Sequence, residues 1–173
     1  MRYVAIDVET TGLGERCGLL ELAMVAEDTT QTVPVEDLPF LRALFWPEGA
    51  VWEPFAMKMH RANGLLDEIL ANFGSEYALD NAVAWGDAEK WLRANTSGKI
   101  APAGKNFAGF DRRFLGPIAG LFDYRALDPG SVFADFSKDR LPGLADLLPQ
   151  DRASHRALDD ARDVVRVLRR AYA

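Results

Sequence analysis

The sequence predicts an α/β domain in which a sheet is covered by helices, and three observations predict it. The chain has 173 residues, which is the length of one ordinary domain. Apolar residues make up 49% of it and charged residues 27%, a balance typical of a folded protein. Strand-like segments come first, followed by segments of helical periodicity mixed with short extended ones, which is typical of layered α/β domains. We therefore expect a single domain over residues 1–173.

The first third of the chain is predicted to supply most of the strands. Residues 3–9 form a β-branched run that ends at Thr10-Thr11-Gly12, as expected of a buried strand. Residues 19–26 and 32–35 are plausible neighbouring strands. Residues 41–52 show no clear periodicity.

The rest of the chain is predicted to be mainly helical. A short extended piece spans residues 100–104, and Pro129-Gly130 marks a turn. Helical periodicity is found at residues 57–73, 77–94, 107–122, 141–148 and 154–172. Ser154 is a candidate N-cap of the last helix.

Composition excludes several classes of protein. No run of about 18 apolar residues is present, so we expect no membrane span. The apolar run before Asp7 is too short for a signal peptide, and the single Cys17 excludes an internal disulfide or a cysteine-rich zinc site. Both features favour a cytoplasmic protein. The net charge of −6 excludes a broadly basic nucleic-acid coat, although metal ions among clustered acids would reverse the local sign.

Asp7 and Glu9 form the first of three acidic groups. Side chains alternate along a strand, so these two share a face with Cα atoms about 6.6 Å apart. Two carboxylates at that spacing can converge on one hard cation. The alternative is an edge strand with a solvated acidic face. The opposite face is apolar, and Tyr3 and Ala5 make the acidic face apolar further back. The pattern therefore favours a metal site.

Asp111 forms the second group. It falls inside the apolar stripe of the predicted helix 107–122, while Arg112 and Arg113 point away from that stripe. An unpaired carboxylate in a core face costs several kcal/mol unless it is paired, protonated or metal-bound. The alternative is an aspartate at the boundary of the core that reaches a backbone donor or an arginine.

The third group lies at the start of the last helix. Asp159 points away from the apolar face of that helix, whereas Asp160 lies at its margin, where it could reach a strand. His155 precedes them, and a lone histidine at a helix start is commonly only a surface residue. The chain has just one other histidine, His60. Four carboxylates from three segments need counter-charge in order to share a site, and divalent metal supplies it.

The three groups together resemble the motifs of the DEDDh 3′–5′ exonucleases. The matching segments are residues 7–13, residues 106–111, and His155 followed by Asp160, in the order and spacing of that family. The resemblance implies a ribonuclease-H-like fold, a mixed sheet flanked by helices. It also implies hydrolysis that releases nucleoside 5′-monophosphates, with His155 as the general base. Two Mg²⁺ or Mn²⁺ ions would be held by Asp7, Glu9, Asp111 and Asp160.

A narrower resemblance is to the oligoribonuclease branch, which degrades short single-stranded RNA as a homodimer. Residues 111–115, 122–128 and 155–160 look like segments of that branch, as do Met59-His60 and residues 64–66. The substrate contacts implied by this resemblance are Thr10, Leu13, Phe55, His60, Phe107, Tyr124 and Arg125.

Some of these contacts have a specific implied role. Leu13 would insert between the two terminal bases, and His60 would cap the 5′ phosphate of a dinucleotide. Tyr124 and Arg125 would come from the partner subunit.

Three positions depart from the oligoribonuclease pattern. Phe55 stands where that branch has a tryptophan for base stacking, and a phenylalanine still offers a stacking face. Phe107 and Ala126 stand where the branch has hydroxyl residues that cap the phosphate. A weaker cap would admit longer single strands, including single-stranded DNA.

Three other functions compete with a short-RNA exonuclease. Gly12, Gly14 and Gly18 could suggest a dinucleotide-binding loop, but their spacing misses that fingerprint and the preceding acids would repel a pyrophosphate. A nucleotide-binding module without turnover would be expected to lack a catalytic residue, and all five are present here. A general or proofreading-type DNA exonuclease remains open, although the Tyr124-Arg125 and His60 segments favour RNA.

Overall fold

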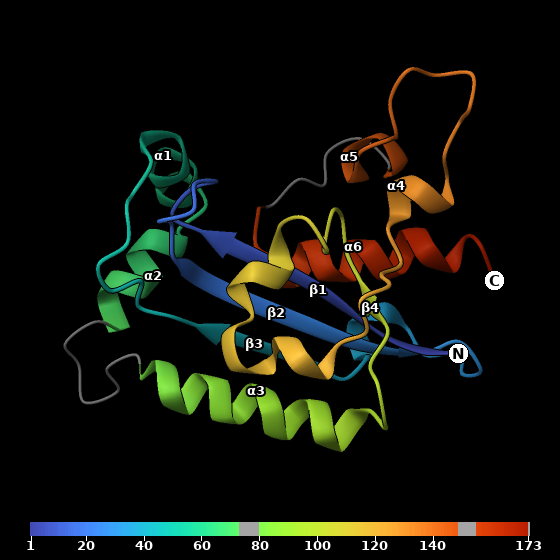
Figure 1. The fold of residues 1–173 in the computed structure, drawn as a ribbon, viewed down its shortest axis with the longest axis horizontal. Coiled ribbons are helices and arrows are strands. Elements are labelled where there is room, and N and C mark those ends of the chain that lie inside the picture. The colour runs from blue at the N-terminus through green and yellow to red at the C-terminus, as the bar shows by residue number, and fades with distance from the viewer. Residues whose placement is uncertain (73–79, 149–154, 173) are drawn as a thin grey trace.

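The computed structural model describes residues 1–72, 80–148 and 155–172. Its four strands form a mixed sheet in the order β3-β2-β1-β4 (Figure 1). β1 pairs antiparallel with β2, β2 pairs antiparallel with β3, and β4 is parallel to β1. The strands are β1 (Arg2–Thr10), β2 (Leu19–Asp28), β3 (Phe40–Leu44) and β4 (Pro102–Ala103). The prediction of a mixed sheet flanked by helices is therefore confirmed.

Helical elements cover both faces of the sheet (Figure 1). On one face, Val4, Ile6 and Val8 of β1 belong to a core shared with α3 (Asn81–Asn95) and the segment after β4. On the other face, Tyr3 and Ala5 pack with α6 (Ala157–Arg169). The odd-numbered side chains of β1 therefore face α6.

The predicted helix over 57–73 is two helices. α1 (Pro54–Ala62) and α2 (Leu65–Asn72) are separated by Asn63-Gly64. Gly64 has φ +79°, a left-handed conformation that ends the first helix and that glycine adopts at little cost.

The predicted helix over 107–122 is wrong. The chain forms turns followed by two short 3₁₀ helices, η2 (Asp111–Phe114) and η3 (Gly116–Leu121). Gly116 has φ +45°, and Pro117 lacks the N–H that a continuous helix needs. The apolar residues of this segment are buried or partly buried in the core, but they lie on turns and 3₁₀ helices rather than on one helical stripe.

Smaller differences concern the other segments. The strand predicted over 32–35 is wrong, because η1 (Val35–Asp37) follows Pro34 there. α4 (Pro129–Val132) replaces the predicted turn, and α5 (Leu144–Leu147) lies within predicted helix 141–148. α6 begins at Ala157, and the predicted N-cap Ser154 lies outside the described residues, as do residues 77–79.

None of the helices within the described ranges is both long and apolar enough to span a membrane.

Candidate active site

Three of the predicted acids meet at the end of β1. Carboxylate oxygens of Asp7, Glu9 and Asp160 all lie within 4.8 Å of one another. Asp7 and Glu9 share the face of β1 that packs on α6, and Asp160 lies in the first turn of that helix. Asp159, its neighbour in sequence, is exposed, as the helical periodicity predicts.

Asp111 reaches the same region by another route. β4 runs parallel to β1, with Ala103 opposite Ala5, so the chain that leaves β4 emerges beside the end of β1. Asp111 opens η2 there and is only 3% exposed. Its carboxylate accepts a hydrogen bond from the backbone N–H of Val8, and its charge acts on Asp7.

Burial and mutual repulsion set the protonation of these acids. Burial, followed by the charges of Asp111 and its other acidic neighbours, holds the pKa of Asp7 well above its ordinary value. Burial and the charge of Asp160 raise the pKa of Glu9 to about 9. Burial is also the main reason why the pKa of Asp160 and that of Asp111 are each raised to about 7. Without a cation the cluster therefore retains protons near neutral pH.

The donor set suits a hard divalent cation. Converging carboxylate oxygens with unfavourable mutual charge are the ligands that Mg²⁺ or Mn²⁺ prefers, and a bound cation would remove the repulsion. Lys105, exposed in the turn after β4, is close enough to lower the pKa of both Asp111 and Asp160. A positive charge beside the cluster favours the approach of an anionic substrate.

Glu21 is a fully buried carboxylate beside this cluster. It lies opposite Glu9 in the β1–β2 register, and its Oε2 accepts the backbone N–H of Ala157 at 2.9 Å. Arg42 donates to Glu21 through Nε, and Arg156 donates to it through Nη2 at 3.4 Å. Sequence reasoning missed Glu21, although a single carboxylate inside the apolar run 19–26 is itself a signal of a buried charge.

Glu68 completes an ion network with the same two arginines. Arg42 makes a two-pronged contact with its carboxylate at 2.8 and 2.7 Å, and Arg156 donates to it at 2.6 Å. The network joins β2, β3 and α2 to the residue that precedes α6. It therefore fixes the start of α6, and with it Asp160, against the sheet.

His155 lies two residues before α6 and is exposed. Its φ of +50° is a strained backbone conformation for a residue with a side chain. Its carbonyl oxygen accepts a hydrogen bond from the side chain of Asn63, between α1 and α2. The backbone of His155 is thus held in place while its imidazole faces solvent.

His60 differs from His155 in being completely buried. Its Nε2 lies 2.8 Å from the carbonyl oxygen of Thr10 and 3.9 Å from Oε2 of Glu9, while its Nδ1 has no hydrogen-bond partner among the residues that the structure describes. Burial lowers the pKa of this imidazole. Thr10 is also buried, and its hydroxyl donates to the carbonyl of Gly12. Both residues support the end of β1.

The other predicted substrate residues divide into exposed and buried ones. Leu13 is 73% exposed, Phe55 79% and Tyr124 70%, all unusually high for apolar or aromatic side chains. Arg125 stacks on the Tyr124 ring, with its guanidinium carbon 5.1 Å from the ring centroid. Phe107, in contrast, is a core residue that packs edge-on against Phe122.

Two solved structures have a similar fold. The nuclease domain of 3′hExo, a DEDDh family member bound to rAMP, aligns with a TM-score of 0.65 and 15% identity over 98% of this chain and 90% of that one. The S. pombe Pop2p structure in its Mg²⁺- and Mn²⁺-bound form aligns with a TM-score of 0.59 and 14% identity over 96% of this chain and 81% of that one. The chain thus has the ribonuclease-H-like fold of DEDDh exonuclease domains.

Curated relatives identify the family within this fold. The oligoribonuclease of Streptomyces griseus is 31% identical over 97% of this chain and 83% of its own length. The Klebsiella pneumoniae oligoribonuclease is 29% identical over 92% and 87%, and a probable oligoribonuclease of Drosophila melanogaster is 28% identical over 95% and 78%. No family model matches the sequence. The chain belongs to the oligoribonuclease family.

Proposed function

We propose that this protein is a divalent-metal-dependent 3′–5′ exoribonuclease that removes nucleoside 5′-monophosphates from short single-stranded RNA. The observation that carries the proposal is the convergence of Asp7, Glu9 and Asp160 within 4.8 Å, with Asp111 beside them, in a chain of the oligoribonuclease family. A hard-cation site of this kind can activate a water and stabilise the charge that develops when a phosphodiester is hydrolysed.

The four acids would hold two Mg²⁺ or Mn²⁺ ions. Such ions supply Lewis-acid stabilisation of the charge that develops on the scissile phosphate and the leaving oxygen. His155, exposed and held through its backbone by Asn63, would accept the proton of the attacking water near neutral pH. Lys105 would add positive charge along the path of the phosphate.

The exposed apolar side chains would contact the bases. Leu13 and Phe55 would pack against the two terminal bases, as the family resemblance implies. His60 would act on the 5′ phosphate only after movement, because it is buried against Thr10 here. Because Phe107 and Ala126 carry no hydroxyl group, we expect the protein to accept longer RNA and single-stranded DNA as well.

A second subunit would complete the site. Tyr124 and Arg125 form an exposed stacked pair, which is the form expected of side chains that act across a homodimer interface. We expect this homodimer to work in the cytoplasm, where RNA fragments are produced and the lone Cys17 stays reduced.

A time course on 5′-labelled RNA and DNA of graded length tests the function. It is run with Mg²⁺, Mn²⁺ or chelator, and Asp7→Ala is the control. Metal-dependent release of 3′-terminal monophosphates from short RNA supports the proposal. Equal trimming of long RNA and DNA indicates a general exonuclease. No cleavage with either metal, together with retained nucleotide binding, would indicate a binding module instead.

A further inference from the structure

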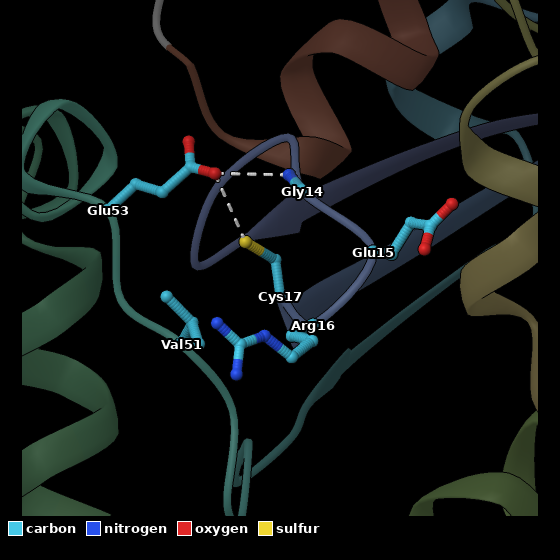
Figure 2. A pocket seen from close by; sticks show the side chains of 6 residues that line it. All are labelled: Gly14, Glu15, Arg16, Cys17, Val51 and Glu53. Carbon is cyan, nitrogen blue, oxygen red and sulfur yellow. Dashed lines mark hydrogen bonds between the residues drawn. The ribbon is translucent and has the colours of Figure 1, made fainter.

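The loop that follows β1, residues 11–18, carries the exposed Leu13 beside the carboxylate cluster. The side chain of Leu13 makes little contact with the protein, since 73% of it is exposed. A cavity of about 380 Å³ lies beside the loop, between it and the segment that carries Val51 and Glu53 (Figure 2). Packing of the Leu13 side chain therefore contributes little to the position of the loop tip, and hydrogen bonds set it.

Three hydrogen bonds from the loop converge on one carboxylate, and backbone bonds, such as the one from the Val51 N–H to the carbonyl of Arg16 at 2.8 Å, hold other parts of it. Glu53 Oε2 accepts the backbone N–H of Leu13, and its Oε1 accepts that of Gly14, each at 3.1 Å. Cys17 Sγ donates to the same Oε1 at 3.4 Å (Figure 2). These three donors keep the pKa of Glu53 below its ordinary value, so the carboxylate is charged at neutral pH.

Gly12 allows this close approach. A Cβ atom at this position would lie 2.3–2.6 Å from the Glu53 side chain, closer than any real contact. Its φ of +154° is also one that other residues rarely adopt. The glycine of the first motif is thus explained by the carboxylate that it accommodates.

The opposite side of Leu13 is also held. Its carbonyl oxygen accepts a hydrogen bond from Arg113 Nη2 at 2.7 Å. Arg113 is itself fixed by stacking on Phe110 and Phe114, each 4.7 Å from its guanidinium carbon. It lies in η2, two residues after Asp111. Leu13 therefore has both backbone groups bound and its side chain free.

Glu53 also connects this loop to a second exposed side chain. It is the residue that precedes α1, and its own backbone N–H donates to the carbonyl of Thr11 at 2.8 Å. Phe55, two residues later, is 79% exposed. One residue thus sets the relative position of the two apolar side chains that flank the site.

We propose that Glu53 and Arg113 are positioning residues. They hold the backbone of Leu13 at the site, so that its side chain is in place to contact the two terminal bases of short single-stranded RNA. The inference rests on the proposed function and deepens it. A Leu13 whose backbone is held in advance loses less freedom on binding, so it favours substrates that offer two terminal bases to its side chain over those that offer one.

Two substrates separate this role from catalysis. One is a dinucleotide RNA, and the other is the p-nitrophenyl ester of thymidine 5′-monophosphate, which has a single base. Leu13→Ala, Glu53→Gln and Arg113→Lys are each expected to raise KM for the dinucleotide by about ten- to a hundredfold, the range for a lost apolar contact, and to affect the ester much less. Glu15→Gln is the matched control, since Glu15 lies on the same loop and points away from Gly14 and Cys17 (Figure 2).

The double variant Leu13→Ala/Glu53→Gln gives the sharpest test. Because Glu53 acts through Leu13, the double variant should lose no more on the dinucleotide than Leu13→Ala alone. Equal losses on both substrates, or fully additive losses, would overturn the proposal. So would a normal dinucleotide KM in Glu53→Gln. If the wild-type protein cleaves neither substrate, the proposed function itself fails. Thermal unfolding of each variant identifies any that is simply misfolded.

Discussion

The buried carboxylate of Glu21, on β2, accepts the backbone N–H of Ala157, the first residue of α6, at 2.9 Å. A strand thereby caps a helix that starts 136 residues later. Because α6 carries Asp160 in its first turn, this bond fixes how far that carboxylate lies from Glu9, which is the register partner of Glu21. The geometry of the carboxylate cluster thus depends on a residue outside the predicted catalytic motifs.

Replacing Glu21 should damage both stability and activity. Glu21→Ala leaves the side chains of Arg42 and Arg156 without one of their anionic partners, and removing one member of a buried ion network costs about 3–5 kcal/mol. Glu21→Gln should cost less, because it keeps an oxygen for the N–H of Ala157. Urea unfolding measures both variants, with the exposed Glu48→Ala as control. Unchanged stability in Glu21→Ala would show that the network does not hold α6.

Sequence patterns predict the parts of this site that depend on contacts between residues close together in the chain. Strand alternation correctly placed Asp7 and Glu9 on one face, and helical periodicity correctly distinguished Asp160 from Asp159, because both patterns are local. Asp111 is buried as predicted, but on a 3₁₀ turn, since glycines and Pro117 break the expected helix.

Long-range contacts were beyond the reach of sequence patterns. The partners of Glu21 lie as many as 136 residues away, and those of Glu53 about 40. Neither spacing leaves a periodic signal in the chain. Only the fold brings these carboxylates to the backbone groups that they hold.

The two neighbouring aspartates of α6 should behave differently. Asp160→Asn removes a carboxylate from the cluster, whereas Asp159→Asn changes an exposed residue. Turnover should fall more than about a hundredfold in the first variant, because even indirect supports of metal ligands cost 10–100-fold, and less than about twofold in the second. Steady-state rates on a dinucleotide RNA measure both. Equal losses in the two variants would refute the assignment of Asp160 to the metal site.

Complementation tests whether Tyr124 acts across a dimer. Tyr124→Ala and Asp7→Ala should each be nearly inactive as pure proteins. In a mixed dimer, the Asp7→Ala subunit can lend its Tyr124 to the intact acids of its partner, so one of the two sites works. Random mixing makes about half of the dimers mixed, so about a quarter of wild-type activity should return. An active Tyr124→Ala monomer, or no recovery on mixing, would contradict a shared site.

The carboxylate cluster should make the metal-free protein less stable as pH rises. The pKa of Glu9 is raised to about 9, and those of Asp111 and Asp160 to about 7, all above their values in the unfolded chain. Between about pH 5.5 and pH 9 these three carboxyls therefore bind more protons in the folded state than in the unfolded state, and their contribution to the free energy of unfolding falls as pH rises. In chelator, the thermal unfolding midpoint should be lower at about pH 8.5 than at about pH 5.5. Addition of Mn²⁺ should raise the midpoint at the higher pH again, because cations bind the folded state. Glu9→Gln replaces a group that the folded state keeps protonated with one that is neutral at every pH, so it should raise the metal-free midpoint at the higher pH, unlike Glu15→Gln. A metal-free midpoint that rises with pH would mean that the acids are not crowded as their positions imply.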